Sequence, residues 1–310
     1  MRVVLTAVLA IAGCAADAGG GEPDPATARA LAATAGLRWI LDHRDSLPEG
    51  WSFHVLDHLY RVVTDDQVAA EIRRMVIEDD AAGKYLHLPE RLDDPRNMQP
   101  AILGRILLEL LRRKELGRPY EQQRDDIQEQ ITAGEAELFS KLSPTRQLIQ
   151  LYLFEELGIE STITFESSLR DIRAAGERRD PKTLPADRVY MLALTHVVFN
   201  RSRYFVDYVD PNEIDFVVGQ LRRALQHYVE SPPDDFFLDI QAESLQCWQL
   251  LGLPQDEVAA AYAGLVQRQN ADGTWGAADL DHPRRVHITY SAALALLKYP
   301  REFRRFRTAP

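Results

Sequence analysis

Two cysteines, Cys14 and Cys247, are too few for a disulfide framework, and several widespread catalytic motifs are missing from the 310 residues. The sequence has no glycine-rich phosphate loop, no GxSxG elbow and no HExxH pair, so common nucleotide and hydrolase chemistries lose support. Basic residues are in deficit, with 36 Lys and Arg against 47 Asp and Glu. The resulting net charge of −11 argues against a nucleic-acid partner, whose phosphates need a basic face.

Long hydrophobic runs are also scarce, because beyond the N-terminus none reaches the roughly 18 residues that span a bilayer. The N-terminus, MRVVLTAVLAIAGC, has one Arg, an apolar run at 3–12 and then IAGC. This order resembles the signal peptide and lipobox of bacterial lipoproteins. The resemblance implies cleavage before Cys14, lipid on that residue, and anchoring on the periplasmic side of a membrane. Ala15 in the next position favours the outer membrane. The alternative is a short buried helix with a chance cysteine.

The rest of the chain has the composition of a folded protein, because 45% hydrophobic and 27% charged residues can bury a sizeable core. We predict a signal peptide at 1–13, a flexible Gly/Pro-rich tether at 14–25 and a helical domain at 26–300. Residues 301–310 form a basic tail with two Phe, which we interpret as a solvated terminus, with contact to acidic lipid as the alternative. A monomer is the expected state.

Apolar periodicity and Pro/Gly breaks predict helices throughout this domain and no alternating strand. The twelve predicted helices cover 26–43, 51–63, 65–80, 97–114, 119–140, 144–157, 166–179, 186–200, 211–230, 236–252, 255–270 and 286–298. The even-numbered helices are more apolar, whereas the odd-numbered ones carry charge on one side. This alternation predicts an all-α (α/α)6 toroid, in which six inner and six outer antiparallel helices close into a double ring. An open α-solenoid or an irregular bundle would show similar helix pairs.

The link after the eleventh helix, QNADGTW at 269–275, matches the QxxDGxW pattern of terpenoid cyclases. It also resembles turns in the wider superfamily that includes the protein prenyltransferases. Asp272-Gly273 suits a turn in which glycine takes a positive φ, and Trp275 can fold back onto the helix just completed. The resemblance covers this one link closely and implies the toroid fold rather than a reaction. An ordinary turn followed by a packed tryptophan is the alternative.

Polar side chains on the predicted inner helices would face a shared lumen, and several could bind a divalent transition metal such as zinc, iron or copper. The candidate ligands are His54, His58, His196, Asp239, Cys247 and His287. Asp239, Glu243 and Cys247 lie at i, i+4 and i+8, so they form a polar stripe on an apolar helix. Two buried carboxylates need compensation, which a metal, a protonated His, or Arg284 and Arg285 could provide. Each imidazole could instead be satisfied by a backbone carbonyl or a hydroxyl.

These features predict a metal-dependent enzyme in which Asp239 or Glu243 acts as the general base or as a ligand. The apolar lumen favours an isoprenoid-like or other lipid-like small molecule as substrate. Protein prenyltransferases hold zinc with an Asp, a Cys and a His, so the resemblance implies such a site without assigning its residues. The DxDD acid motif of the cyclases is missing. Two other functions stay open: a non-catalytic binding or scaffold lipoprotein, and a metal-free glycan-processing toroid with paired carboxylates.

Overall fold

The computed structural model describes residues 23–47, 51–85, 87–92, 98–180, 182–235 and 237–306. These residues form twelve α-helices and no β-strand, which confirms the predicted all-α class. No helix in this part of the chain combines the length and the hydropathy that a membrane-spanning segment needs. The predicted signal peptide and Cys14 lie outside the described residues, so the lipid anchor stays a prediction.

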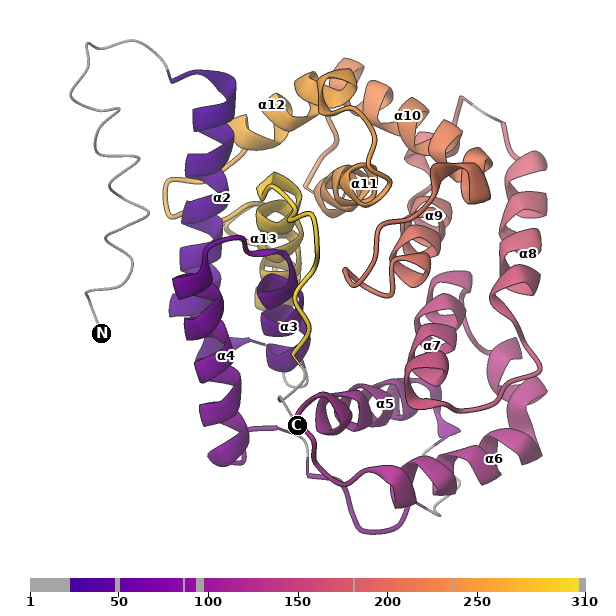
Figure 1. Cartoon of the computed structure of the whole chain (residues 1–310). Helices are drawn as coiled ribbons and strands as arrows, with labels where there is room; N and C mark the ends of the chain where they lie inside the picture. Colours follow the sequence, from indigo (N-terminus) through magenta and orange to yellow (C-terminus); the bar gives the residue numbers. More distant parts are fainter. Residues whose placement is uncertain are drawn as a thin grey trace.

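The helices alternate between two concentric rings, as Figure 1 shows. The outer ring contains α2 (Pro25–Asp42), α4 (Asp66–Ala81), α6 (Glu121–Ser140), α8 (Phe165–Glu177), α10 (Asp215–Glu230) and α12 (Ala259–Gln267). The inner ring contains α3 (Ser52–Val62), α5 (Pro100–Glu115), α7 (Pro144–Leu157), α9 (Arg188–Arg201), α11 (Leu238–Leu250) and α13 (His282–Leu296). Neighbouring inner helices pack together from α5 through α7, α9 and α11 to α13, and α13 also packs against α2 and α3. The first and last helices therefore meet, and the predicted toroid is confirmed.

The helices begin at local signals in the sequence. The side chain of Asp24 caps α2, Asp65 caps α4, Ser143 caps α7 and Asp187 caps α9. Each of these side chains accepts a first-turn backbone N–H that has no partner within the helix. Prolines lie in the first turn of α2, α5, α7 and α13, where the missing N–H is not needed. These caps and prolines explain why most predicted helix bounds agree with the observed ones to within a few residues.

The turn at 269–275 connects α12 to two other helices. Trp275 is fully buried, and its indole Nε1 donates to the Leu265 carbonyl of α12 at 2.8 Å. Gly273 has a φ of 88°, a conformation that glycine adopts without strain. The Trp275 ring lies against Gly36 of α2, where an added Cβ would be 2.7 Å from it. The Trp275 backbone N–H donates to Thr289 Oγ1 of α13 at 3.2 Å. The prediction that Trp275 packs onto the helix just completed is confirmed.

Two predictions about the C-terminal region are wrong in detail. The last helix begins at His282 rather than at 286, because the Asp281 side chain accepts from the Arg284 N–H at 3.0 Å and caps the helix one turn earlier. The tail is not wholly solvated, because Phe306 is 1% exposed and its ring lies 6.1 Å from that of Phe53 on α3. The described part of the tail therefore covers α3.

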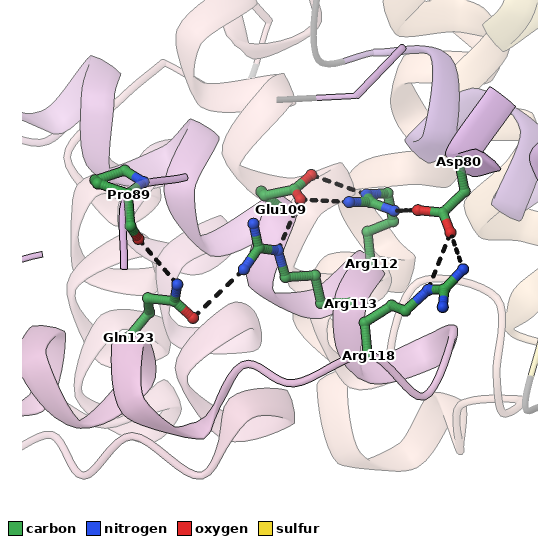
Figure 2. Close-up of polar contacts among 7 residues, drawn as sticks. All are labelled: Asp80, Pro89, Glu109, Arg112, Arg113, Arg118 and Gln123. Atoms are coloured by element: carbon green, nitrogen blue, oxygen red, sulfur yellow. Dashed lines mark hydrogen bonds and ion pairs between the residues drawn. The ribbon is translucent and has the colours of Figure 1, made fainter. Parts of the chain in front are cut away.

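A buried ionic network joins the ends of α4 and α5 (Figure 2). Arg112 is 6% exposed and donates to both Glu109 and Asp80. Arg113 is a second donor to Glu109 at 3.0 Å, and Arg118 is a second donor to Asp80 at 2.8 Å. Because each carboxylate accepts from two guanidinium groups, the desolvation of these charges is compensated. Helix α5 thus ends in a set of ion pairs in which Arg112 and Glu109 are buried and Arg118 is exposed.

Candidate active site at the N-terminal end of the inner ring

The candidate site residues lie on four inner helices. Helix α3 carries His54 and His58, α9 carries His196, α11 carries Asp239, Glu243 and Cys247, and α13 carries His287. Contacts among Arg188, Asp239 and His287 bring the first two turns of α9, α11 and α13 together at one end of the inner ring. The same end includes Trp51, just before α3, whose ring meets His287 edge-on with 5.7 Å between centroids. Side chains as far apart in the sequence as Trp51 and His287 therefore belong to one site.

His287 lies between the two carboxyl groups of the polar stripe. Its Nδ1 is 3.4 Å from Asp239 Oδ2, and its Nε2 is 3.6 Å from Glu243 Oε1. The side chains of Asp239 and Glu243 are 2% and 5% exposed, whereas the imidazole keeps 30% exposure. Burial alone lowers the pKa of His287, but the contact with Asp239 and the charge of Glu243 outweigh burial and raise this pKa. His287 is therefore the accessible member of the group and is protonated more readily than a free histidine.

Asp239 stays ionised although it is buried. Its Oδ2 accepts a hydrogen bond from the Arg188 guanidinium at the start of α9. Burial raises the pKa of Asp239, but the contacts with His287 and Arg188 outweigh burial and hold this pKa below its ordinary value. The sequence left open an arginine partner for Asp239, with Arg284 and Arg285 as the candidates. Asp239 does pair with an arginine, but that arginine is Arg188. Arg285 pairs instead with Asp272, at 2.8 Å.

Glu243 lies one turn further along α11 in a different environment. Its Oε2 accepts from the Thr195 hydroxyl of α9 at 2.8 Å. Burial raises the pKa of Glu243 from its ordinary 4.5 to about 7, while His287 opposes this rise and Asp239 adds to it. A carboxyl group with a pKa near neutrality can both donate and accept a proton at working pH, which is what a general acid or base requires.

The three other candidate histidines, His54, His58 and His196, are neutral at neutral pH. Burial lowers the pKa of His54 to about 3 and that of His196 to about 4, and it lowers the pKa of His58 well below its ordinary value. The His54 and His58 rings are 4.0 Å apart between centroids. His58 Nδ1 is hydrogen-bonded to the Tyr290 hydroxyl, and His196 Nδ1 donates to the Leu192 carbonyl at 2.9 Å. A hydroxyl or a carbonyl therefore satisfies one nitrogen of each of these two rings.

The candidate ligands do not form a preassembled metal site. Within the described ranges, no group of three or more His, Cys, Asp and Glu side chains is arranged to hold one ion. Both nitrogens of His287 already face carboxyl groups. Cys247 is fully buried, and its thiol donates to the Thr195 carbonyl at 3.5 Å. Burial raises the pKa of this thiol well above its ordinary value, so it is not the thiolate that binds metals. The metal stays a prediction that this donor set does not favour.

Sequence reasoning missed two residues of the site, Arg188 and Tyr204. Arg188 is the first residue of an inner helix, and this position at the end of the predicted ring is a sequence signal for a cation near Asp239. Tyr204 lies in the link between α9 and α10, and no sequence motif marks this position. Both residues reach the site through contacts between segments that are far apart in the chain.

The link after α9 holds Tyr204 in a strained backbone conformation. Arg203, Tyr204 and Phe205 have φ values of 51°, 50° and 66°. Non-glycine residues in this left-handed region cost on the order of 1 kcal/mol or more each, so surrounding contacts must stabilise the turn. Arg61 of α3 is 2% exposed and donates to the carbonyls of Arg203 and Tyr204 at 3.4 and 3.3 Å. The same guanidinium is paired with Asp57 at 2.7 Å. This buried pair connects α3 to the turn.

The sequence matches no protein-family model, no curated protein and no solved structure at a significant level.

Proposed function

We propose that this protein is a lipid-anchored acid–base enzyme that hydrolyses a glycosidic bond at the N-terminal end of its inner ring. The proposal rests on the different protonation of two carboxyl groups one helical turn apart, because Asp239 is ionised and Glu243 titrates near pH 7. Glycoside hydrolysis needs such a pair, in which one group donates a proton and the other acts as a carboxylate. This is the metal-free alternative that the sequence left open.

The polarity of the site supports a hydroxylated substrate. Arg188, Thr195, His287 and the two carboxyl groups would gain no partners from an isoprenoid chain, and excluding water from them without new hydrogen bonds is costly. A sugar instead offers several hydroxyl groups to such a set. Trp51 is half-buried beside His287, and its ring provides an apolar surface for the C–H face of a sugar. An isoprenoid-like substrate stays a prediction that these residues favour less.

Four residues of the site have roles in this reaction. Glu243 in its acid form donates its proton to the leaving oxygen as the glycosidic C–O bond breaks. A water molecule attacks the anomeric carbon and gives a proton to the Asp239 carboxylate. Because His287 contacts both carboxyl groups, it can return this proton from Asp239 to Glu243 and restore the starting state. Arg188 keeps Asp239 ionised between turnovers.

Hydrolysis of a panel of 4-nitrophenyl glycosides and labelled oligosaccharides tests the proposal. We expect Glu243→Gln to lower kcat by roughly 10²- to 10⁴-fold, the usual effect of losing a general acid. The wild-type rate should fall as the pH rises above about 7, where Glu243 loses its proton. Glu257→Gln is a matched control, because Glu257 is an exposed glutamate paired with Arg222 at 3.2 Å. A wild-type protein that cleaves no glycoside, or a fully active Glu243→Gln variant, would contradict the proposal.

The anchor and the metal need separate experiments. Lipid on Cys14 would hold the enzyme at the periplasmic face of a membrane, with the outer membrane favoured. Metal analysis of untagged protein tests the metal, with His287→Ala as the test variant and His227→Ala on the outer helix α10 as its control. Near-stoichiometric metal that is lost only in His287→Ala would replace the acid–base proposal with a metal-dependent enzyme. Binding of a saccharide without cleavage, unchanged in Glu243→Gln, would instead indicate the non-catalytic binding lipoprotein.

A further inference from the structure

The ring of Tyr204 lies among the histidines of the site. Its centroid is 5.6 Å from that of His58, 6.1 Å from that of His54 and 6.3 Å from that of His196. The ring of Tyr152 on α7 is closer still, at 4.4 Å, and lies at an angle of 38° to it. Helices α3, α7 and α9 therefore all contribute to the surroundings of this one side chain.

The Tyr204 hydroxyl is a buried donor without a partner. The residue is 5% exposed, and its oxygen has no hydrogen bond to any described residue. Burial, with further contributions from Tyr152 and Glu243, raises the pKa of Tyr204 well above its ordinary value, so the phenol keeps its proton. Buried hydroxyl groups in folded proteins are usually hydrogen-bonded, and leaving one unpaired lowers stability. No described residue accepts a hydrogen bond from this hydroxyl, and its place among the histidines of the site distinguishes it from other unpartnered hydroxyls of the protein.

The backbone conformation of Tyr204 also indicates that this residue takes part in a site. Tyr204 is the middle residue of the left-handed turn, and its N–H donates to the Phe199 carbonyl at 2.8 Å. The Ser202 hydroxyl donates to the same carbonyl at 2.9 Å, and Arg61 donates to the carbonyl of Tyr204 itself. A strained conformation that several contacts maintain is typical of residues that take part in a site. The turn thus fixes an aromatic donor where it has no partner of its own.

We propose that Tyr204 is a substrate-contacting residue, whose hydroxyl donates a hydrogen bond to an oxygen of the sugar bound beside Glu243. This inference rests on the proposed function and extends it from the reaction to the recognition of the substrate. A saccharide oxygen would supply the acceptor that the hydroxyl lacks in the free protein. A sugar without an oxygen at that position would leave the donor unpaired, so Tyr204 would also determine specificity.

Tyr204→Phe removes the hydroxyl and keeps the ring, so it separates recognition from packing. Because the hydroxyl has no partner among the described residues, we expect the variant to have an unchanged or higher melting temperature. Its kcat/KM for the 4-nitrophenyl glycosides that the wild type cleaves should fall about tenfold or more, which is the effect of losing one good hydrogen bond. The position of the pH profile should not change, because Glu243 and Asp239 remain in place.

Tyr299→Phe is the matched control. Tyr299 is also buried, and its hydroxyl has no partner in the described part of the chain, but it follows α13 and its ring packs against Phe205 and Phe303. Removing its hydroxyl should leave both the melting temperature and kcat/KM unchanged.

A lower melting temperature of Tyr204→Phe would overturn the inference, because the hydroxyl would then have a structural partner. An unchanged kcat/KM would also overturn it. If the wild type cleaves no glycoside, the proposed function alone fails. Weaker binding of labelled oligosaccharides by Tyr204→Phe, but not by Tyr299→Phe, would then still support the contact.

Discussion

Replacing Glu243 by Gln should make the protein more stable above neutral pH, although the residue lies in the proposed active site. Burial holds the pKa of Glu243 at about 7, compared with an ordinary value of 4.5. The unfolded chain therefore releases this proton at a lower pH than the folded protein does. The contribution of Glu243 to the wild-type free energy of unfolding is greatest below about pH 4.5. It decreases as the pH rises from 4.5 to about 7, and it is lost above about pH 7.

The size of this effect follows from the two pKa values. At about 1.4 kcal/mol for each tenfold change in the ionisation constant, the interval from 4.5 to about 7 corresponds to about 3–4 kcal/mol. The amide of Gln does not ionise, and its oxygen can still accept from the Thr195 hydroxyl. The variant should therefore be up to about 3–4 kcal/mol more stable than wild type at pH 8, since the pKa of about 7 already includes the attraction between ionised Glu243 and His287. The difference should be small at pH 5.

Urea denaturation of both proteins between pH 5 and pH 8.5 measures this difference directly. Glu257→Gln is the surface control, because this carboxylate is exposed and its replacement should change the free energy of unfolding little. Asp239→Asn should instead lower the free energy of unfolding, because it removes a carboxylate whose pKa is lowered and leaves Arg188 without its ion pair. A Glu243→Gln variant that is less stable than wild type at pH 8, or equally affected at every pH, would refute the reasoning.

Three further changes test the packing and the anchor. Arg61→Met should lower the free energy of unfolding by about 3–5 kcal/mol, because it leaves Asp57 buried without its ion pair; an unchanged urea midpoint would contradict this. Gly36→Ala should cost about 1–3 kcal/mol, because its Cβ would lie 2.7 Å from the ring of Trp275; thermal denaturation should show a lower Tm. Cys14→Ser should move the protein from the membrane to the soluble fraction, and its retention in the membrane would argue against the anchor.

The fold could be predicted from the sequence because its signals are local. Seven of the twelve helices in the described residues begin at a side-chain cap or a first-turn proline, and apolar faces recur along the helices. The turn ending in Trp275 is also local, because the indole bonds to Leu265 only ten positions away. Once the helices alternate between two rings, the side chains of different inner helices must meet. This is why the sequence indicated residues such as His196 and His287 that lie far apart in the chain.

The partners of the charged groups could not be predicted, because they depend on how each helix is rotated about its axis. Arg285 is closer to His287 in the sequence than Arg188 is, but it turns outward to Asp272. Arg188 reaches Asp239 from 51 positions away because α9 packs beside α11. Periodicity places a residue on one side of a helix and does not say which side chain of the neighbouring helix it meets.

The two carboxyl groups of α11 show most clearly why spacing alone cannot assign chemistry. Asp239 and Glu243 lie on one stripe and are both buried, so their sequence positions suggest equivalent roles. Their protonation differs because Asp239 is near the helix start, where both His287 and the Arg188 guanidinium contact it. Glu243 is one turn deeper, where it shares His287 and accepts from the neutral Thr195 hydroxyl. The charged partners of Asp239 lower its pKa, and the desolvation of Glu243 raises its pKa to about 7. One turn of a single helix thus supplies both a carboxylate and a proton donor at the same pH.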